Sequence, residues 1–231
     1  MFNHFNRLSK KYFNNIGDKK KLYDLIAKKI EPKFKNKVVL DIGNGGNFFY
    51  NYKNSKKITV LDQSNEMLTK LNDNKITKIN QDARDMSIID NKSIDTILIC
   101  FVLHHINGPK YKDSIISLNK IINQAEKKLH SKGELIIVEL TLNNFLFFFQ
   151  KLFYQFTYFI LSKFNTDMVF FYKDKIIKDS ISINFKKYNL SYEKIKMFGW
   201  LDPLLGTFPG IIKIPSFLMP TSLKIFYVKK N

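Results

Sequence analysis

Cysteine and arginine are nearly missing from this sequence of 231 residues. The single cysteine, Cys100, excludes an internal disulfide and any zinc site built from several cysteines. Because Cys100 lies in an apolar run, we expect a buried, unreactive thiol. The only two arginines are Arg7 and Arg84, whereas proteins that read nucleic acid sequences depend on arginine side chains to grip bases. The scarcity of arginine therefore argues against a sequence-specific nucleic-acid target.

The chain also lacks internal repeats and an arginine-led apolar segment of the signal-peptide kind, which predicts a cytoplasmic protein. A hydrophobic fraction of 45% and a charged fraction of 25% are typical of a folded domain and exclude global disorder. A chain of this length suits one α/β domain better than two.

Positive charge, in contrast, is abundant, and most of the excess lies at the two ends of the chain. The formal net charge is +18, with 11 basic against 3 acidic residues in 1–37 and 11 against 4 in 173–231. The part between them holds 16 basic and 13 acidic residues. Basic ends predict attraction to an anionic surface such as acidic lipid headgroups or nucleic acid. The alternative is that abundant Lys, Asn and Ile reflect only an A+T-rich genome.

Apolar runs alternate with amphipathic segments, which is typical of a parallel sheet with crossover helices. Strands are expected at 37–42, 57–62, 76–80, 94–102, 134–140, 192–197 and 223–228. Helices are expected at 19–30, 64–71, 113–129 and 174–188. Pro32 should end the first helix, Ser64 should cap the second, and Gly133 should lie just beyond the third.

The peptide KVVLDIGNGGNFFY, residues 37–50, joins the first strand to a glycine-rich turn. Its glycines let the backbone turn sharply and approach a ligand closely. Asp62 lies 21 residues after Asp41 and ends the second strand, where it can accept hydrogen bonds from ribose hydroxyls. Phe48 stands where the dinucleotide fingerprint needs glycine, so we expect a nucleotide cofactor without a diphosphate.

Five motifs across residues 35–140 resemble, in order and spacing, those of class I S-adenosylmethionine-dependent methyltransferases, and they are VVLDIGNGG, VLDQSNEML, INQDARDM, SIDTILICFVLHHI and GELIIVEL. The variety they resemble is the small-molecule type similar to quinone C-methyltransferases. The resemblance implies a Rossmann-like, doubly wound, seven-stranded sheet with its last strand antiparallel and helices on both faces. It also implies S-adenosyl-L-methionine as the cofactor.

The resemblance assigns roles to residues of the first two motifs. Asp41 would act through the glycine turn near the methionine moiety of the cofactor. Gly43 and Gly45 would bring the main chain close to the adenosine, and Asp62 would accept the ribose hydroxyls.

Further cofactor contacts follow from the later motifs of the resemblance. Gln63 and Met67 would line the adenine pocket, and Asp82 would accept from the adenine amino group. The backbone N–H of Ala83 would face the ring edge, and Phe101 would border the methionine side.

Two features at the front of the chain bear on the same site. The stretch FNRLSKKYFNN resembles the mobile cover of the family, with Tyr12 as a candidate contact. Asn47 stands where the family commonly has a third glycine. Asparagine tolerates positive φ, but its side chain can crowd the cofactor and weaken its binding.

His105 is the candidate general base, and Glu139, at the end of the fifth strand, is a second candidate. The alternative for His105 is an ordinary packed or water-bonded imidazole. His104 and His105 are adjacent and the other histidines form no ligand spacing, so no metal site is expected.

Residues 142–161 carry Lys151 as their only charge and are long enough to span a membrane. On a helical wheel, however, polar residues gather on one side, which favours an aromatic amphipathic helix that lies on a membrane or covers an apolar pocket. The alternative is a core helix packed on the sheet. The expected apolar side consists of Phe145, Phe149, Leu152, Phe153, Phe156, Phe159 and Ile160.

The predicted layout is a single domain over 1–231. Within it we expect an N-terminal helical cover, a cofactor-binding core, an aromatic helical insertion, and C-terminal strands with a substrate loop, at 1–36, 37–140, 141–190 and 191–231. The Pro- and Gly-containing stretch at 198–220 favours a long ordered loop over a hairpin.

Together these features predict methyl transfer to a hydrophobic small molecule, lipid or prenylated ring, with the protein free in the cytoplasm or bound peripherally to a membrane. An RNA methyltransferase is the alternative enzyme, although no Asn-Pro-Pro-Tyr-like tetrapeptide follows the fourth strand and no proline precedes Cys100. The alternative outside enzymes is a binding module that has lost catalysis. The replacement of the third glycine by Asn47 is the sequence feature that favours it. The sequence names neither the acceptor atom nor the oligomeric state.

Overall fold

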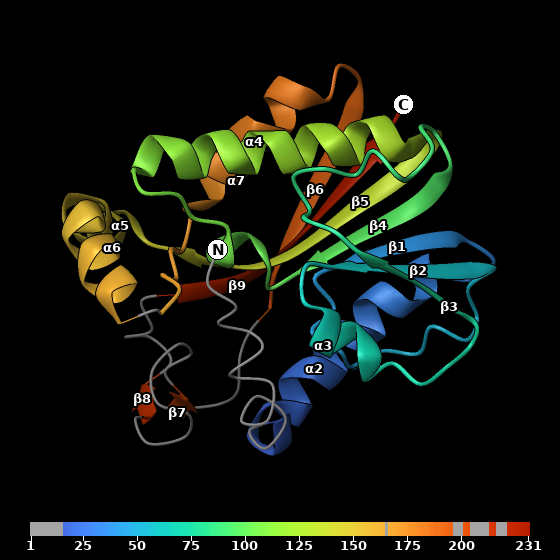
Figure 1. Ribbon diagram of the computed structural model, residues 1–231, viewed down its shortest axis with the longest axis horizontal. Coiled ribbons are helices and arrows are strands. Elements are labelled where there is room, and N and C mark those ends of the chain that lie inside the picture. The colour runs from blue at the N-terminus through green and yellow to red at the C-terminus, as the bar shows by residue number, and fades with distance from the viewer. Residues whose placement is uncertain (1–15, 165, 196–200, 204–212, 216–220) are drawn as a thin grey trace.

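Seven strands form one central sheet in the computed structural model, which describes residues 16–164, 166–195, 201–203, 213–215 and 221–231. The sheet order is β3-β2-β1-β4-β5-β9-β6 (Figure 1). The strands are β1 (Val38–Ile42), β2 (Lys57–Asp62), β3 (Ile76–Asn80), β4 (Ile94–Cys100), β5 (Leu129–Leu142), β6 (Tyr188–Ile195) and β9 (Thr221–Lys230). Strands β1 to β5 pair in parallel, and β9 runs antiparallel between β5 and β6. The expected doubly wound sheet with an antiparallel last strand is therefore confirmed.

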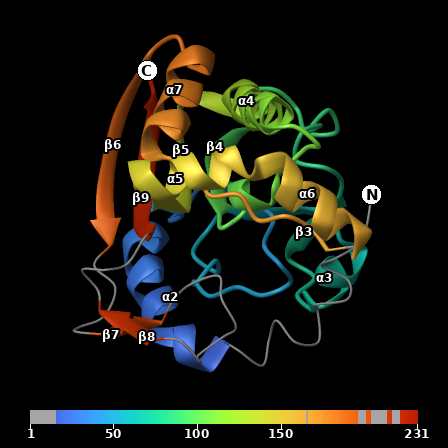
Figure 2. The same ribbon diagram turned by 90° about the vertical axis from the view of Figure 1, so that its left-hand side faces the viewer.

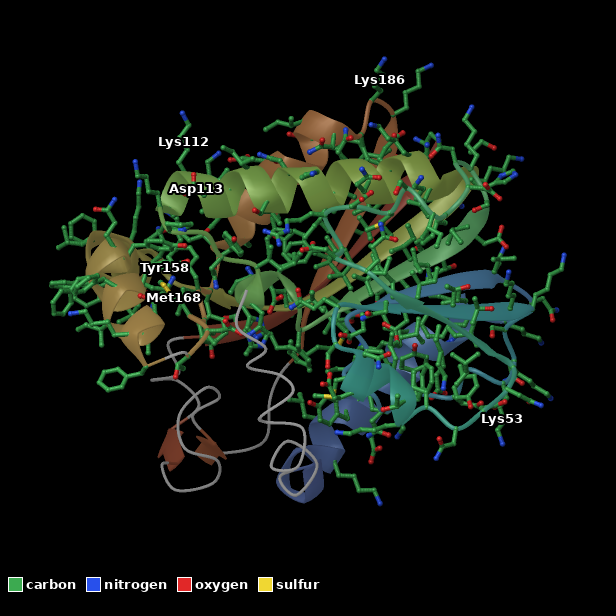
Figure 3. All side chains as sticks on the ribbon, in the orientation of Figure 1. Lys53, Lys112, Asp113, Tyr158, Met168 and Lys186 are labelled. Atoms are coloured by element: carbon green, nitrogen blue, oxygen red, sulfur yellow. The ribbon has the colours of Figure 1, made fainter. Side chains whose placement is uncertain are left out.

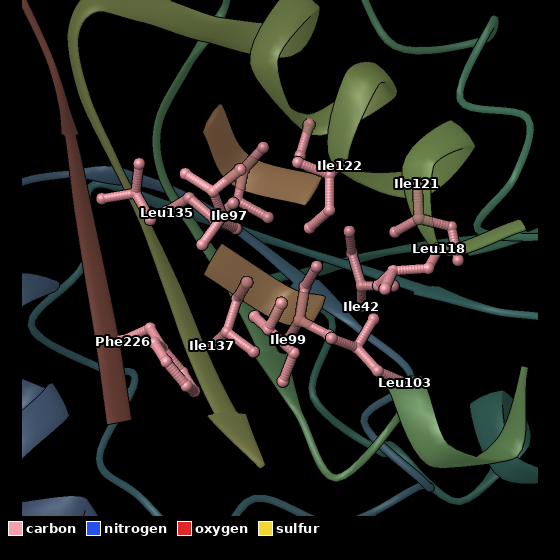
Figure 4. Packing of buried hydrophobic residues seen from close by; sticks show 14 of the residues in the cluster. Ile42, Ile97, Ile99, Leu103, Leu118, Ile121, Ile122, Leu135, Ile137 and Phe226 are labelled. Carbon is pink, nitrogen blue, oxygen red and sulfur yellow. The ribbon is translucent and has the colours of Figure 1, made fainter. Parts of the chain in front are cut away.

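Apolar side chains alternate between two cores on opposite faces of the sheet, because successive strand residues point to opposite sides. In β4, Ile97 and Ile99 belong to one core, and Leu98 belongs to the other. Leu118 and Ile122 of helix α4 (Tyr111–Lys128) pack onto the first of these cores (Figure 4). Burial on both faces explains why the strand sequences are continuously apolar.

Four helices cover the two faces (Figure 1). They are α4 with α7 (Asp174–Asn184) on one face, and α2 (Ile16–Ile30) with α3 (Asn65–Thr69) on the other. As predicted, α2 ends before Pro32, which lies in a short 3-10 turn at Glu31–Lys33. Ser64 caps α3, where its Oγ accepts the backbone N–H of Met67 at 3.3 Å.

Several expected boundaries were wrong. The helix expected at 174–188 ends at Asn184, and β6 begins at Tyr188 and not at 192. Helix α4 ends at Lys128 and the next strand begins at once, so Gly133 lies inside β5 and not beyond a helix end. A Cβ at Gly133 would lie 3.1 Å from the carbonyl oxygen of Asp95, which explains why glycine stands there. Strand β4 ends at Cys100, because Phe101 adopts a left-handed backbone with φ +56°.

The aromatic segment forms two helices, α5 (Asn144–Leu152) and α6 (Tyr154–Lys163), and not the single helix expected. Asn143 caps α5, since its side chain accepts the backbone N–H of Leu146 at 2.9 Å. Figure 2 shows the pair crossing one end of the sheet. Because α5 follows β5 directly, this end holds the carboxyl ends of the parallel strands.

Tyr154 and Gln150 of the polar side face inward together with Phe147. The expected apolar side is largely exposed, so the core-helix alternative was wrong for that side. Tyr154 is buried, and its hydroxyl donates to the carbonyl of Gly108 at 2.8 Å and lies 2.5 Å from Oγ of Ser114. The Gln150 amide exchanges two hydrogen bonds with the backbone of Phe171, at 2.9 and 3.1 Å.

The connection between β6 and β9 contains an antiparallel pair, β7 (Leu201–Pro203) and β8 (Lys213–Pro215), where we expected a loop without a hairpin. The rest of that connection lies outside the described residues. Tyr12 and the predicted N-terminal cover up to residue 15 also lie outside them.

Candidate active site

A cavity of about 380 Å³ opens at the carboxyl ends of β1, β2 and β4. Its wall combines the turn after β1, the end of β2, the loop after β3 and the residues after β4. Helix α6 and the segment 166–168 close another side. The volume falls within the range of roughly 300–1,000 Å³ that is usual for small-molecule sites.

The turn after β1 owes its shape to three glycines with positive φ, at +69° for Gly43, +70° for Gly45 and +78° for Gly46. A Cβ at Gly46 would lie 2.6 Å from the carbonyl oxygen of Met67, and one at Gly43 would lie 2.5 Å from Cγ2 of Val102. The turn therefore packs main chain directly against its neighbours, and Gly43 and Gly45 present backbone to the cavity as predicted.

Asp62 stands at the end of β2 with its carboxylate in the cavity wall. Its two oxygens accept backbone N–H groups, from Ser64 at 2.8 Å and from Gly45 at 3.2 Å. Burial raises the pKa of Asp62, and these two hydrogen bonds oppose the rise. A carboxylate has about four acceptor positions, so this fixed group retains capacity for two ligand hydroxyls.

Asp41 lies behind the turn and is absent from the cavity wall. One of its oxygens accepts both the Asn44 amide and the Tyr50 hydroxyl, each at 2.6 Å. Burial raises the pKa of Asp41 to about 6, although both hydrogen bonds lower it. Asp41 therefore shapes the turn from beneath, through Asn44 and Tyr50. Its predicted action on the cofactor stays a prediction.

Past β3, Asp82 reaches the cavity wall together with Arg84, whose guanidinium pairs with both carboxylate oxygens. Burial would raise the pKa of Asp82, but the hydrogen bonds from Arg84 outweigh it and hold the pKa below its usual range. The predicted adenine contacts Gln63, Met67 and Ala83 lie in the same wall. Arg84 was missed, because nothing in the motif signals its bond to Asp82.

Phe101 borders the cavity with its strained backbone, since φ +56° is uncommon for a bulky residue. Its N–H donates to the carbonyl of Val138 at 2.9 Å, and its ring meets Tyr23 edge-on at 6.2 Å. Tyr23 also contacts Phe49 at 4.9 Å between ring centroids. Tyr23 and Phe49 are cavity residues that sequence reasoning missed, because their meeting depends on how α2 packs.

His105 lies in the cavity wall, as expected for a general base. Its ring packs against that of His104 at a tilt of 46°, with centroids 4.1 Å apart. The buried Glu139 does not line the cavity, so the prediction of a second base there was wrong. Its carboxylate instead accepts the Leu103 backbone N–H at 3.0 Å and lies 2.6 Å from Nδ1 of His104.

The polar side of α6 supplies Tyr158 and Ser162 to the cavity, and Met168 follows from the next segment (Figure 3). Asn107 joins them, with its amide donating to the carbonyls of His104 at 2.9 Å and Met168 at 2.5 Å. The wheel grouped Tyr158 and Ser162 as polar, but sequence alone gave no reason to place that side against the cofactor core.

Cys100 is a free thiol that lies half-buried in the cavity wall, and burial raises its pKa well above the usual value. Asn47 also lines the cavity, and it does so without positive φ. Within the residues that the structure describes, no group of three or more His, Cys, Asp or Glu side chains is arranged to hold a metal ion.

These groups fit S-adenosylmethionine. The wall carries the carboxylates of Asp62 and Asp82, and Asp41 lies close behind them. Asp62 is fixed by backbone donors and offers acceptors to a sugar, while the glycine turn leaves the main chain accessible. The Asp82 carboxylate is paired with Arg84, so the fit rests on the acceptor oxygens of Asp62 and on the accessible main chain.

Comparison with known proteins also indicates a methyltransferase domain. Residues 40–137 match a protein-family model described as a methyltransferase domain. No curated protein matches the sequence at a significant level.

Among solved structures, an S-adenosylmethionine-dependent methyltransferase from Thermotoga maritima has a TM-score of 0.63 and 14% identity over 100% of both chains. The YcgJ protein from Bacillus subtilis has a TM-score of 0.61 and 13% identity over 90% of this chain and 98% of its own. At these identities the likeness establishes the fold, and the family match adds the domain type. Together they give a match to a methyltransferase domain over residues 40–137, on a fold shared with these solved structures.

Proposed function

We propose that the protein transfers a methyl group from S-adenosylmethionine to a nucleophilic carbon, oxygen or nitrogen of a hydrophobic small-molecule acceptor. The observation that carries this proposal is the mixed lining of the cavity. The wall combines Asp62, Asp82 and the glycine turn with the largely apolar side chains of Phe101, Val102, Ile106, Tyr158 and Met168.

The cofactor, when bound, supplies a methyl group already activated on a sulfonium. The chain has to bind it, align the acceptor and exclude water, and orientation of this kind can contribute roughly 7–11 kcal/mol. Asp62 and the main chain of the turn would hold the adenosine, with Met67 and Ala83 beside the base. Phe101 and Tyr158 would screen the reacting atoms from solvent.

His105 has the role of accepting a proton from an acceptor hydroxyl, if the acceptor is a phenol or an enol. General-base help of this kind contributes about 10²- to 10⁴-fold in rate. An amine acceptor would not require it.

Calorimetry with S-adenosylmethionine and S-adenosylhomocysteine tests the cofactor, and binding of both is expected. Labelled cofactor incubated with total cell extract, followed by partition between organic and aqueous phases, tests the acceptor. Label in the organic phase is expected. Absence of heat with either ligand would refute the enzyme, label in RNA would favour the RNA methyltransferase, and tight binding without transfer would favour the binding module.

A further inference from the structure

A contiguous apolar surface covers the outer side of α5 and α6, and we call it the α5–α6 face. Its side chains are between 40% and 73% exposed, in a part of the chain that folds as regular helix. They are Phe145, Phe148, Phe149, Leu152, Phe153, Phe156, Phe159 and Phe164. With roughly 200 Å² for each aromatic side chain, the exposed area is on the order of 800 Å². The largest apolar patch of an ordinary monomer covers only about 300–600 Å².

Hydrogen bonds on the inner side keep this face turned outward. Tyr154 and Gln150 anchor the helices through the backbone carbonyls of Gly108 and Phe171. Rotating the helices to bury the phenylalanines would break these bonds and bury polar groups without partners, which is costly. The exposure is therefore a built-in property of this part of the fold.

Charge identifies what can cover the face. Residues 144–163 contain no acidic residue, and their only charges are Lys151 and Lys163. Lys163 lies over the ring of Phe159 at 4.3 Å, so its ammonium group borders the apolar surface. Lys151 is exposed on α5 and lies over Tyr111 at 4.8 Å, and Lys112 and Asp113 lie at the nearby start of α4 (Figure 3). Aromatic rings edged by lysines match the interface of a bilayer with anionic headgroups.

The described helices include none with the length and apolar character needed to cross a membrane, so the contact would be peripheral.

Helix α6 has a second property that makes such a contact useful. Tyr158 and Ser162 on one side of it line the cavity, and Phe156 and Phe159 on the other side belong to the exposed face. One helix thus separates the bilayer-facing surface from the cavity.

We propose that the α5–α6 face docks on the surface of an anionic lipid bilayer and places the cavity beside the lipid phase. A hydrophobic acceptor dissolved in the membrane could then enter past α6. The docking itself stands on the exposed face, while the entry of the acceptor rests on the proposed function.

Flotation separates the alternatives. The full chain is mixed with vesicles of phosphatidylcholine alone, or of phosphatidylcholine with phosphatidylglycerol, and the floating fraction is measured. The protein is expected to float with the anionic vesicles. Phe156→Ser combined with Phe159→Ser should lower the partition coefficient at least about tenfold, because two apolar side chains no longer enter the interface. Ile88→Ser combined with Ile183→Ser, two equally exposed positions elsewhere, should leave it unchanged.

Lysine substitutions in the same flotation assay test the electrostatic part of the proposal. Lys151→Gln combined with Lys163→Gln should weaken flotation with anionic vesicles at least about tenfold, because two positive charges near such a surface are lost. Lys53→Gln combined with Lys56→Gln, at exposed positions on the opposite end of the molecule (Figure 3), should have little effect. Equal flotation of all four variants would overturn the docking proposal.

Two further readouts keep the proposals apart. Calorimetry with S-adenosylmethionine is run on the same variants, since neither Phe156 nor Phe159 lines the cavity. Normal cofactor binding without flotation would overturn docking alone, and flotation without cofactor binding would overturn the proposed function alone. Sedimentation velocity without lipid should show a monomer. A dimer that dissociates in the Phe156→Ser/Phe159→Ser variant would assign the face to a second copy and overturn membrane docking.

Discussion

The carboxylate of Asp62 accepts the backbone N–H of Gly45 at 3.2 Å, across the gap between the end of β2 and the turn after β1. Two neighbouring strands thereby present one rigid edge to the cavity. The acid holds the turn in place and still faces the ligand space with its remaining acceptor positions. A change at this one residue should therefore affect both the turn and the cofactor.

Asp62→Ala should weaken binding of S-adenosylmethionine by at least about 100-fold. Two hydrogen bonds to a charged acceptor are lost, each worth roughly 1.5–3 kcal/mol, and tenfold corresponds to about 1.4 kcal/mol. Isothermal titration calorimetry measures the affinity. Asp90→Ala, which removes an exposed carboxylate outside the cavity, is the matched control and should bind as the original protein does. An Asp62→Ala protein that is folded and keeps its affinity within twofold would contradict the assigned cofactor site.

Gly46→Ala should disturb the turn from its other side. The new Cβ would lie 2.6 Å from the carbonyl oxygen of Met67, and φ +78° is strained for alanine. We expect a loss of about 1–3 kcal/mol in the free energy of unfolding, together with weaker cofactor binding, because the backbone of Met67 must move. Urea denaturation and calorimetry measure the two effects. In Gly133→Ala, at the opposite end of the sheet, only stability should fall, so equal loss of affinity in both variants would speak against a local effect.

The sheet could be predicted because its signals are local. Each buried strand has its own apolar run, and each turn or cap has its own residue type, as at Ser64. The position of Gly133 could not be read in this way. It depends on close approach to the Asp95 carbonyl of a neighbouring strand, which no local pattern encodes.

The same distinction between local and tertiary signals applies to the residues of the candidate site. Asp62 and the glycine turn follow from motifs, because each motif sits at the end of a predictable strand. Arg84, Tyr23 and Asn107 reach the cavity through tertiary packing. The aromatic segment shows a further limit, since its periodicity identified two sides but not which of them would face inward.

Asp41→Asn should change how stability depends on pH. In the folded protein the pKa of Asp41 is raised from 3.8 to about 6, so folding favours the protonated form. The stability contributed by that form is complete below pH 3.8 and is lost as the pH rises through 6. The free energy of unfolding should therefore fall by about 2 kcal/mol more in the original protein than in Asp41→Asn between pH 4 and pH 7.

Urea denaturation at several pH values measures this difference. Other carboxyl groups with a raised pKa, such as Asp62, contribute equally in the two proteins, so their contributions to the pH dependence cancel. Tyr50→Phe is the companion variant. It removes a hydrogen bond that lowers the pKa of Asp41, so its stability should fall more steeply over the same range. Parallel curves for all three proteins would show that Asp41 does not titrate as its burial requires.

His105→Gln should separate a catalytic imidazole from a packed one. With a phenol or enol acceptor, we expect kcat to fall about 10²- to 10⁴-fold, because the base that removes the hydroxyl proton is gone. Affinity for S-adenosylmethionine should stay within about twofold, since the predicted cofactor contacts lie elsewhere in the wall. With a catalytic base at this position, the rate of the original protein should rise with pH, and the variant should lack this rise. His130→Gln, at an exposed histidine of β5, should keep both rate and pH profile. If His105→Gln lowered only the unfolding temperature and kept the rise in rate, the imidazole would be a packing group beside His104.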